Sequence, residues 1–398
     1  MIGGIRTGGV RGSDIRLNGV LKYMDKIMYI TGSFPRLGDG IGDAAGRLYG
    51  AMPDKKDIKL VTTDDPAIKG YIKEKRYQNV TLVEDWRLGS VNGILKKIKK
   101  ERIHKVLIEY AGNGYGRDLA ISFLPLRIKI HDLFAKEKVE CHLRLHEFTM
   151  CRPARKLFTY PLVWFCDHLD TPSFVEYLHL KERYGNKVVK SAIGSNINWR
   201  TEKKEFKKKP GDKIKLAFFG GIYPGKGIEK LIAMWGEIEK RYPGVYDYQL
   251  LGGFPEGRAN VFDNYQASVQ KLIEKKGLKD KIMVSGFLPE GEIESWLDQV
   301  DIAVLPYEDG LTLRRGSFLA FLGRNVAVVT SMGDPQASVL FRDARGVKMC
   351  SGAEEMIKAI RDYSENDRYY EAGLDNARFQ DFFNWERIAE TVLGCFTD

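Results

Sequence analysis

Short apolar runs alternate with longer stretches of mixed polarity along most of the chain. The first run, residues 26–31 (KIMYIT), is followed by a glycine-rich turn and a helical pattern over 42–52. A long helix is expected over 117–136. Further runs of strand type lie at 58–63, 79–84, 105–110 and 139–145. Strand-type runs that alternate with helical patterns predict βαβ units and a parallel sheet.

A charged stretch over 199–213 interrupts this alternation. It has few aliphatic residues and contains Pro210-Gly211, so it is the best interdomain linker in the sequence. Helical patterns then return over 227–242 and 263–277. Strand-type runs lie at 213–220, 246–253, 281–286, 301–306 and 326–331. We therefore predict an α/β fold with two Rossmann-like doubly wound domains facing a cleft, where ligands bind beyond the carboxyl ends of the strands.

The composition is that of a globular chain. Of the 398 residues, 43% are hydrophobic and 29% charged, which argues against disordered, collagen-like and coiled-coil classes. No apolar run is long enough for a transmembrane helix, and the N-terminus lacks the apolar core of a secretory signal. Residues 1–25 are rich in Gly and Arg and predict a disordered leader. Five scattered cysteines without a C-x-x-C pair favour the reducing cytoplasm.

The net charge of +10 is concentrated in three segments. Residues 1–26 carry a net +3, and residues 94–105 and 199–215 carry +5 each, so the other residues together carry −3. A nucleic-acid-binding protein more often spreads Lys and Arg over one face with interleaved aromatic residues, so no nucleic acid partner is expected.

The basic segment 94–105 (ILKKIKKERIHK) is interpreted as an amphipathic helix. Its apolar residues Ile94, Leu95, Ile98 and Ile103 would lie on one face, with lysines on the rest. It either packs on the sheet as an ordinary surface helix or docks on anionic lipid, which attracts polybasic helices. The second interpretation gives a peripheral contact with the inner face of a membrane.

A glycine-rich turn, GSFPRLGDGIGD (32–43), connects the first predicted strand to its helix. Gly38, Gly40 and Gly42 follow the strand and open that helix, where backbone N–H groups favour a negatively charged ligand. The turn matches neither G-x-G-x-x-G nor a P-loop, so the alternative is an ordinary tight turn.

A second turn of this kind, FFGGIYPGKG (218–227), opens the C-terminal half. Gly220 and Gly221 free the backbone, and Lys226 can place a cation at the helix start. Amides and a cation beyond a strand end suit a phosphate or diphosphate. The alternative is a Gly-Pro turn with a solvated lysine.

A third motif, LPYEDGLTLRRGSFLAFL (305–322), places two arginines before an apolar helix. Cations at a helix N-terminus oppose the helix dipole, which favours an anion at this position over two solvated arginines. Its polar and glycine residues of interest are Asp309, Arg314, Arg315, Gly316 and Ser317.

A histidine ends one of the apolar strands, in RLHEF (144–148). A strand-end His146 in a cleft can donate to a substrate hydroxyl or take part in proton transfer, although a lone His is more often structural. The other five histidines show no metal-ligand spacing such as H-E-x-x-H, so no metal site is expected.

Together these segments resemble the retaining GT-B glycosyltransferases of the sucrose-synthase-like family 4, or glycosyl transferases group 1. The resemblance covers roughly residues 26–398. FFNWERIAE (382–390) is similar to the family's C-terminal helix, which crosses back onto the N-terminal domain. The other segments that carry it are the first glycine-rich turn, LHEF, AIGSNI (192–197), FFGGIYPGKG, GFLPEGEI (286–293), DIAVLP and DGLTLRRGSFLAFLGRNVAVVTS.

The resemblance implies a domain plan and a donor. The plan is an acceptor-side domain over 26–198, a linker over 199–213, a nucleotide-sugar domain over 214–378 and a returning helix within 379–398. The donor is a nucleotide-diphosphate sugar, UDP- or GDP-linked, and neither a metal nor another cofactor is expected, because protein cations neutralise the leaving diphosphate.

The same resemblance implies roles for individual residues. His146, Lys226 and Arg315 are the expected catalytic residues, with His146 against the donor sugar near its reacting carbon. Phe287 and Leu288 would approach the base. The remaining donor-binding residues would be Gly40, Ile41, Gly42, Gly220, Gly221, Asp309, Arg314, Gly316 and Ser317.

The predicted function is transfer of a hexose, with retention, to a glycan, lipid-linked saccharide or small acceptor, as in polysaccharide biosynthesis. Two departures from the family leave a second hypothesis open, an inactive GT-B binding or scaffold subunit of a glycan-assembly complex. Gly221 stands where the family commonly has Arg, and the paired glutamates E-x7-E appear as Asp309 and Ser317. There are two further alternatives. An NAD-dependent oxidoreductase is disfavoured, because the sequence lacks an intact G-x-G-x-x-G motif with an acidic residue about 20 positions on. A GT-B phosphorylase would have the same fold and would be recognised by phosphate-dependent cleavage of its substrate.

Overall fold

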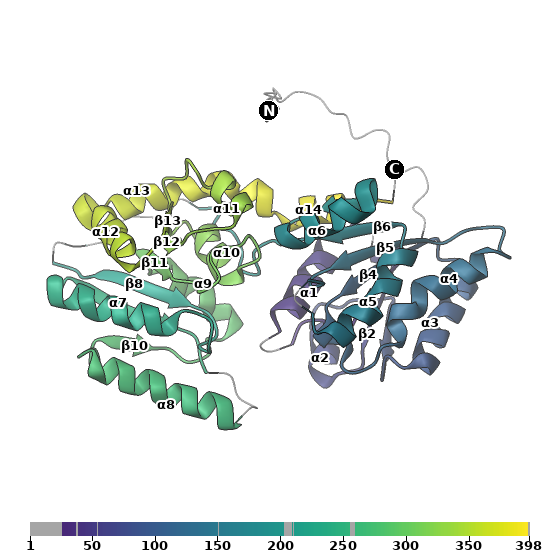
Figure 1. Cartoon of the computed structure of the whole chain (residues 1–398), viewed down its shortest axis with the longest axis horizontal. Helices are drawn as coiled ribbons and strands as arrows, with labels where there is room; N and C mark the ends of the chain where they lie inside the picture. Colours follow the sequence, from purple (N-terminus) through teal and green to yellow (C-terminus); the bar gives the residue numbers. More distant parts are fainter. Residues whose placement is uncertain are drawn as a thin grey trace.

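The computed structural model describes two α/β halves, each built on one parallel sheet (Figure 1). The predicted leader 1–25 and the linker residues 203–208 and 210 lie outside the described residues. The described residues are 26–36, 39–53, 55–149, 151–202, 209, 211–254 and 259–396.

The N-terminal sheet has seven strands in the order β3-β2-β1-β4-β5-β6-β7. Each neighbouring pair is parallel, as the alternation of apolar and helical segments predicts. The strands are β1 (Ile27–Thr31), β2 (Ile58–Thr63), β3 (Val80–Val83), β4 (Lys105–Tyr110), β5 (Glu140–Leu145), β6 (His168–Thr171) and β7 (Val188–Lys190).

Helices cover both faces of this sheet. Alternate residues of β1 point to opposite faces, so Met28 and Ile30 enter one apolar cluster while Ile27 and Tyr29 enter the other. A strand buried on both faces must be apolar along its whole length, which explains the continuous run at 26–31. The helices are α1 (Gly40–Ala51), α2 (Pro66–Glu74), α3 (Leu88–Glu101), α4 (Leu124–Asp132), α5 (Pro153–Phe165) and α6 (Phe174–Tyr184).

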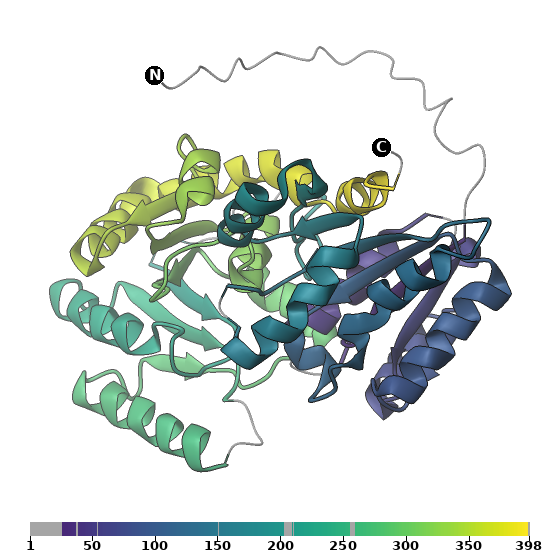
Figure 2. The ribbon, with the colours of Figure 1, turned by 45° about the vertical axis from the view of Figure 1, so that its right-hand side comes forward.

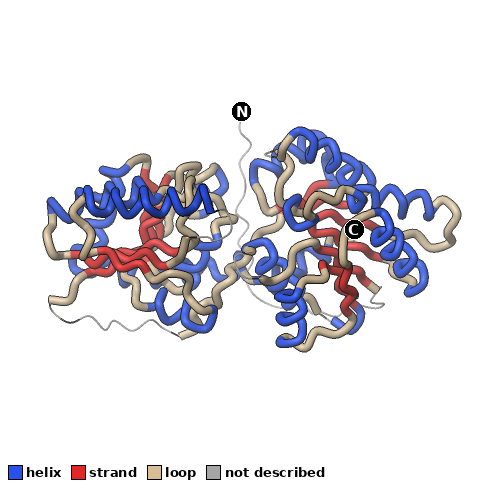
Figure 3. Tube along the Cα trace, turned by 90° about the horizontal axis from the view of Figure 1, so that it is seen from below, coloured by secondary structure: helices blue, strands red, loops and turns tan. Residues whose placement is uncertain are grey.

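The C-terminal sheet has six strands in the order β10-β9-β8-β11-β12-β13, again all parallel. Figure 3 shows both sheets between layers of helices. The strands are β8 (Ile214–Phe219), β9 (Tyr246–Leu251), β10 (Ile282–Val284), β11 (Ile302–Leu305), β12 (Ala327–Ser331) and β13 (Val347–Cys350). The helices are α7 (Ile228–Arg241), α8 (Ala259–Lys275), α9 (Glu290–Asp298), α10 (Gly316–Gly323), α11 (Pro335–Leu340), α12 (Ala353–Ser364), α13 (Arg368–Leu374) and α14 (Trp385–Gly394).

The last helix, α14, packs on the N-terminal half although the chain reaches it from the C-terminal half (Figure 2). Its residues Ile388, Ala389 and Val392 are buried in the cluster that also contains Leu48 of α1. Burial of one such aliphatic side chain stabilises a fold by about 1.5–3 kcal/mol, so α14 ties the two halves together.

Two features of the sequence prediction differ from the structure. The long helix expected over 117–136 is wrong, because the chain forms only a short 3-10 turn, Ala120–Phe123, and then α4. Pro125 lies in the first turn of α4, where its missing N–H costs nothing, and so marks the true helix start. The short strands β6, β7 and β13 were not expected from the apolar pattern.

No helix among the described residues is long and apolar enough to span a membrane.

Candidate functional site

His146 follows β5 directly, at the carboxyl end of the N-terminal sheet. Its backbone N–H donates to the carbonyl of Tyr110 at the end of β4, at 3.1 Å, which extends the strand pairing by one residue. The side chain is only 4% exposed. The predicted strand-end histidine is thus held at a sheet edge of the kind where α/β folds bind ligands.

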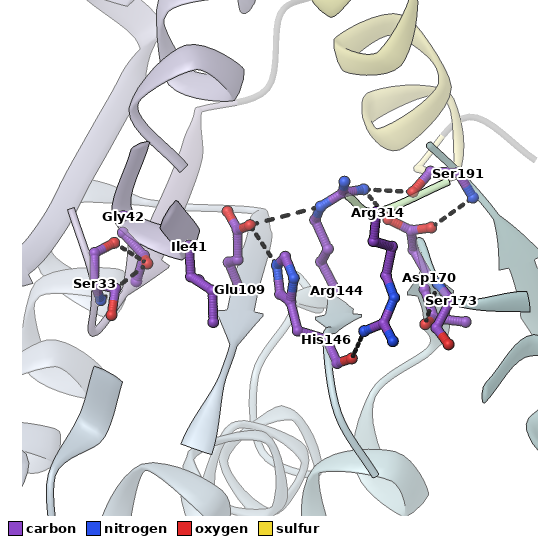
Figure 4. A network of polar contacts seen from close by, with 12 residues as sticks. Ser33, Ile41, Gly42, Glu109, Arg144, His146, Asp170, Ser173, Ser191 and Arg314 are labelled. Atoms are coloured by element: carbon purple, nitrogen blue, oxygen red, sulfur yellow. Dashed lines mark hydrogen bonds and ion pairs between the residues drawn. The ribbon is translucent and has the colours of Figure 1, made fainter. Parts of the chain in front are cut away.

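A buried carboxylate holds the ring of His146 (Figure 4). Nε2 of His146 lies 2.7 Å from Oε1 of Glu109, and Tyr29 donates its hydroxyl to the other oxygen of that carboxylate. An ionised carboxylate only accepts, so Nε2 carries a proton. Nδ1 makes no hydrogen bond to any described residue, and in the neutral ring it is the acceptor.

The charged network extends from Glu109 along the ends of the neighbouring strands. Arg144 lies between Glu109 and Asp170, with Nε 3.6 Å from Glu109 and a hydrogen bond to Asp170. Ser191 completes the far end, because its N–H donates to Asp170 at 3.0 Å and its Oγ accepts from Arg144 at 2.5 Å. Buried charges are tolerated only when paired and hydrogen-bonded, and these are.

A second buried carboxylate fixes the loop after His146. Glu176 of α6 is 3% exposed and accepts from the N–H groups of Phe148 and Thr149 at 2.9 and 2.8 Å. Ser173 in turn caps α6 by accepting from the N–H of Glu176. The loop that carries His146 is therefore held both by β4, through Tyr110 and Glu109, and by α6, through Glu176.

The start of α1 contains the predicted residues Gly40, Ile41 and Gly42. Its N-terminus is capped from within, because Oδ1 of Asp39 accepts from the N–H groups of Ile41 and Gly42 at 3.2 and 2.9 Å. A β-carbon on Gly42 would lie 2.5 Å from the carbonyl oxygen of Phe34, so the turn is closely packed. Two of the amides expected to face the donor are thus already used by the Asp39 carboxylate.

In the C-terminal half, the turn after β8 joins three strand ends. Gly227 has φ +78°, and a β-carbon there would stand 2.0 Å from the carbonyl oxygen of Pro306, after β11. Gly252, after β9, has φ +151° and would place a β-carbon 2.0 Å from the carbonyl oxygen of Gly220. Only glycine fits at these two positions.

Tyr223 occupies the space beside Gly221. A β-carbon on residue 221 would lie 3.0 Å from the ring of Tyr223, and Nζ of Lys226 lies 4.8 Å from the centre of the same ring. A side chain at position 221, such as the arginine that the family commonly carries there, would require this ring to shift by a few tenths of an ångström. Lys226 has no ion-pair partner among the described residues, so its charge is available.

Two helices start at this edge without a side-chain cap. The 14-residue α7 begins after Gly227 and the eight-residue α10 after Arg315, and neither N-cap residue supplies a side-chain hydrogen bond, although the Tyr307 hydroxyl accepts from the N–H of Phe318 in α10. Uncapped helix N-termini leave N–H groups free for an anion. The contrast with the capped α1 places the stronger anion-binding potential in the C-terminal half.

The two adjacent arginines, Arg314 and Arg315, have different partners. Arg315 pairs with Asp309, and its guanidinium lies 4.6 Å from the centre of the Tyr307 ring. The Tyr307 hydroxyl is 2.6 Å from Oγ of Ser317, and burial raises the pKa of Tyr307, so this hydroxyl stays protonated. Arg314 instead reaches the N-terminal half, where Nη1 donates to the carbonyl of His146 at 3.2 Å.

The adjacent residues Phe287 and Leu288 have different surroundings. Phe287 is half exposed and covers Gly253, where a β-carbon would stand 2.5 Å from its ring. It also lines a cavity of about 530 Å³ together with Gln266 and Gln270 of α8. Leu288 packs against the C-terminal core.

The structure thus brings the predicted residues into two groups. His146 contacts Arg314, and Gly220, Asp309, Arg315 and Ser317 gather at the carboxyl edge of the C-terminal sheet. Sequence reasoning missed Glu109, Arg144, Asp170 and Glu176. For the first three the available signal was a charged residue near the end of a strand, whereas Glu176 lies in the first turn of α6. Among the described residues, no three His, Cys, Asp or Glu side chains are grouped to hold a metal ion.

The family comparison identifies the C-terminal part of the chain. Residues 200–378 match the family described as Glycosyl transferases group 1. Among curated proteins, no sequence matches this chain.

Solved structures show the fold of the whole chain. Sucrose-phosphate synthase from Thermosynechococcus elongatus is 14% identical, with a TM-score of 0.68 over 93% of this chain and 98% of that chain. Anabaena HepE in complex with UDP and glucose is 13% identical, with a TM-score of 0.66 over 94% of this chain and 99% of that chain. A putative UDP-N-acetylglucosamine 2-epimerase from Listeria monocytogenes is 14% identical, with a TM-score of 0.58 over 93% and 95%.

Because an epimerase shares this architecture with transferases, the fold alone does not select the reaction. The family match of residues 200–378 favours a glycosyltransferase reaction. The chain has the GT-B fold, and its residues 200–378 match the family of glycosyl transferases group 1.

Proposed function

We propose that the protein transfers a hexose from a UDP- or GDP-linked sugar to a glycan, a lipid-linked saccharide or a small acceptor, with retention of anomeric configuration. The observation that carries this proposal is the contact between Arg314 and His146. It brings the group 1 domain and the buried histidine of the other half to one place. HepE, a protein of the same fold, is described in complex with UDP and glucose.

In this proposal the diphosphate binds at the carboxyl edge of the C-terminal sheet. Lys226, the amides at the start of α7 and the amides of α10 before Phe318 face the leaving phosphates. Arg315 adds positive charge there although it is paired with Asp309. Fixed donors and cations at a leaving group stabilise the charge that develops there. The proposal therefore assigns leaving-group stabilisation to protein cations and requires no metal.

The sugar would lie against His146. Because Nε2 is bonded to Glu109, the ring presents Nδ1, which accepts a hydrogen bond from a sugar hydroxyl when the ring is neutral. Donation by His146 would require the imidazolium. Phe287 would lie near the base. Gly40, Ile41 and Gly42 would approach the donor from α1, through the Ile41 side chain and through van der Waals contacts, since Asp39 uses the amides of Ile41 and Gly42.

The test is a screen of donor hydrolysis and binding over UDP-, GDP- and dTDP-sugars. We expect one nucleotide to bind by calorimetry and its sugar to be released slowly without an acceptor. Proton NMR of the sugar at the first time points should show the anomer of the donor. Release of the opposite anomer would contradict retention, and no binding of any nucleotide sugar would contradict the transferase.

One observation favours a second candidate, an inactive scaffold. Position 317, where the family commonly has a glutamate, holds a serine whose Oγ is bonded to Tyr307. No carboxylate is then available from this position to hold the sugar. Tight nucleotide-sugar binding with no turnover under any acceptor would favour the scaffold.

We also propose that the protein is located in the cytoplasm. All five cysteines are free, and four of them are buried. Free thiols are typical of the reducing cytoplasm, which supports a cytoplasmic location.

A further inference from the structure

The basic helix α3 does not present an apolar face to the surroundings. Its residues Val91, Ile94 and Ile98 are buried against the N-terminal sheet. Lys96, Lys99 and Lys100 remain exposed. The amphipathic pattern at 94–105 is therefore used by the core, and α3 alone offers charge without an apolar anchor.

An apolar anchor is present at the end of the neighbouring helix, α4. Leu124 and Ile128 of α4 are buried in the same core cluster as Ile94. On its other side, Leu133 is 77% exposed and Phe134 89% exposed, just beyond the last turn. Large apolar side chains exposed together at a protruding end mark an interaction site more often than an isolated one does.

The ends of α3 and α4 lie next to each other. Each is followed by a loop that leads into a strand, and the two strands, β4 and β5, are neighbours. The carbonyl of His104 accepts from the N–H of Glu140 at 2.8 Å. The side-chain Nε2 of His104 lies 3.6 Å from a carboxylate oxygen of Glu137. The exposed pair Leu133 and Phe134 thus shares one edge of the sheet with the lysines of α3.

Cations surround this pair and lack acidic partners. The two nearby carboxylates have other partners: Glu101 forms an ion pair with Lys59 at 2.7 Å, and Glu137 lies against His104. Five exposed cations of this edge have no ion-pair partner among the described residues: Lys99, Lys100, Arg102, Lys136 and Lys138. We call these five cations together with Leu133 and Phe134 the α3–α4 tip.

We propose that the α3–α4 tip binds the surface of a bilayer that contains anionic lipid. Apolar side chains that project from a convex end enter the headgroup region, while lysine and arginine reach lipid phosphates. A protein partner fits less well, because the five unpaired cations of the tip match a surface of many phosphates. The tip lies at the amino-terminal edge of the sheet, whereas His146 lies at the carboxyl-terminal edge, so binding leaves the candidate site free.

The test is co-sedimentation of the full chain with vesicles of phosphatidylcholine alone or mixed with phosphatidylglycerol. We expect binding only to the mixed vesicles, with loss of binding at high salt. Leu133→Ser with Phe134→Ser, and separately Lys136→Gln with Lys138→Gln, should each weaken binding about tenfold or more. Leu157→Ser is the matched control, because Leu157 is 65% exposed on α5 and lies outside the tip.

Thermal unfolding of each variant shows that it is folded before it is compared. Vesicle binding that persists unchanged in both double variants would overturn the proposal, as would equal loss in Leu157→Ser. Self-association through the tip, seen by sedimentation velocity without any binding to mixed vesicles, would also overturn it in favour of a second copy of the chain.

Discussion

Nη1 of Arg314 and the main-chain carbonyl of His146 are joined by a hydrogen bond of 3.2 Å. This bond connects the loop before α10 to the end of β5, in the other half of the molecule. Arg315, the next residue, is the N-cap of α10. The histidine proposed to meet the sugar and the cations proposed to meet the diphosphate are therefore positioned against each other, which reduces the entropy lost on reaching the reacting geometry.

Glu109 is predicted to act as a positioning residue for His146. In Glu109→Gln, a neutral amide oxygen replaces the charged acceptor of Nε2–H and holds the ring less firmly, so we expect kcat for transfer to fall about 10- to 100-fold with little change in donor KM. Nitrogen-15 NMR of the histidine ring checks the cause independently of activity, because the wild type should carry its proton on Nε2. The matched control is Glu140→Gln, which breaks a similar Glu–His pair, at 2.6 Å from His168, away from the site. Wild-type kcat in Glu109→Gln, or a proton on Nδ1 in the neutral wild-type ring, would contradict the assignment.

The close approach of Gly227 to Pro306 predicts different costs for two neighbouring substitutions. Both Gly225 and Gly227 have positive φ, +87° and +78°, but only Gly227 has a backbone oxygen in the way of a β-carbon. Gly225→Ala should lower the free energy of unfolding by about 1–2 kcal/mol from backbone strain. Gly227→Ala should cost about 1–3 kcal/mol more from the steric clash. Urea unfolding measures both, and equal costs would show that the turn relaxes freely.

His142 predicts a pH-dependent contribution to stability. Its complete burial lowers its pKa from 6.5 to about 4, against a smaller opposing effect of Asp170, and its ring packs on Phe396 beyond α14. The unfolded chain binds a proton here as pH falls through 6.5, whereas the folded chain does so only near 4, so stability is lost across that interval.

The measurement is urea unfolding of wild type and His142→Leu between neutral pH and pH near 4. The wild type should lose up to about 3 kcal/mol more than the variant over this interval, since other titrating groups are common to both. A constant difference between the two proteins at all pH values would show that His142 is not buried in its neutral form.

The alternation of apolar runs was sufficient to predict the parallel sheets, because strands buried on both faces, such as β1, must be apolar throughout. It failed for β6, β7 and β13, whose short sequences HLDT, VVK and VKMC each include a charged residue and hold few apolar ones. It also failed at 117–136, where the pattern hid the helix start at Pro125.

The candidate site shows the same limit. Glycine turns and cations stand out in the sequence, but Glu109, Arg144 and Asp170 meet only because β4, β5 and β6 are neighbours in the sheet. Pairing between distant segments cannot be predicted from local spacing. The contact of the Tyr223 ring with Gly221 was likewise visible only in three dimensions.

The central claim, that protein cations at the carboxyl edge of the C-terminal sheet stabilise a leaving nucleotide diphosphate, is tested most directly by turnover of Lys226→Met. The control is Lys240→Met, which removes an exposed lysine from the far end of the same helix, α7. With the nucleotide sugar that the wild type hydrolyses, we predict a loss of kcat of about 10²- to 10³-fold in Lys226→Met and none in Lys240→Met, with both variants folded. Wild-type turnover in Lys226→Met would contradict the account.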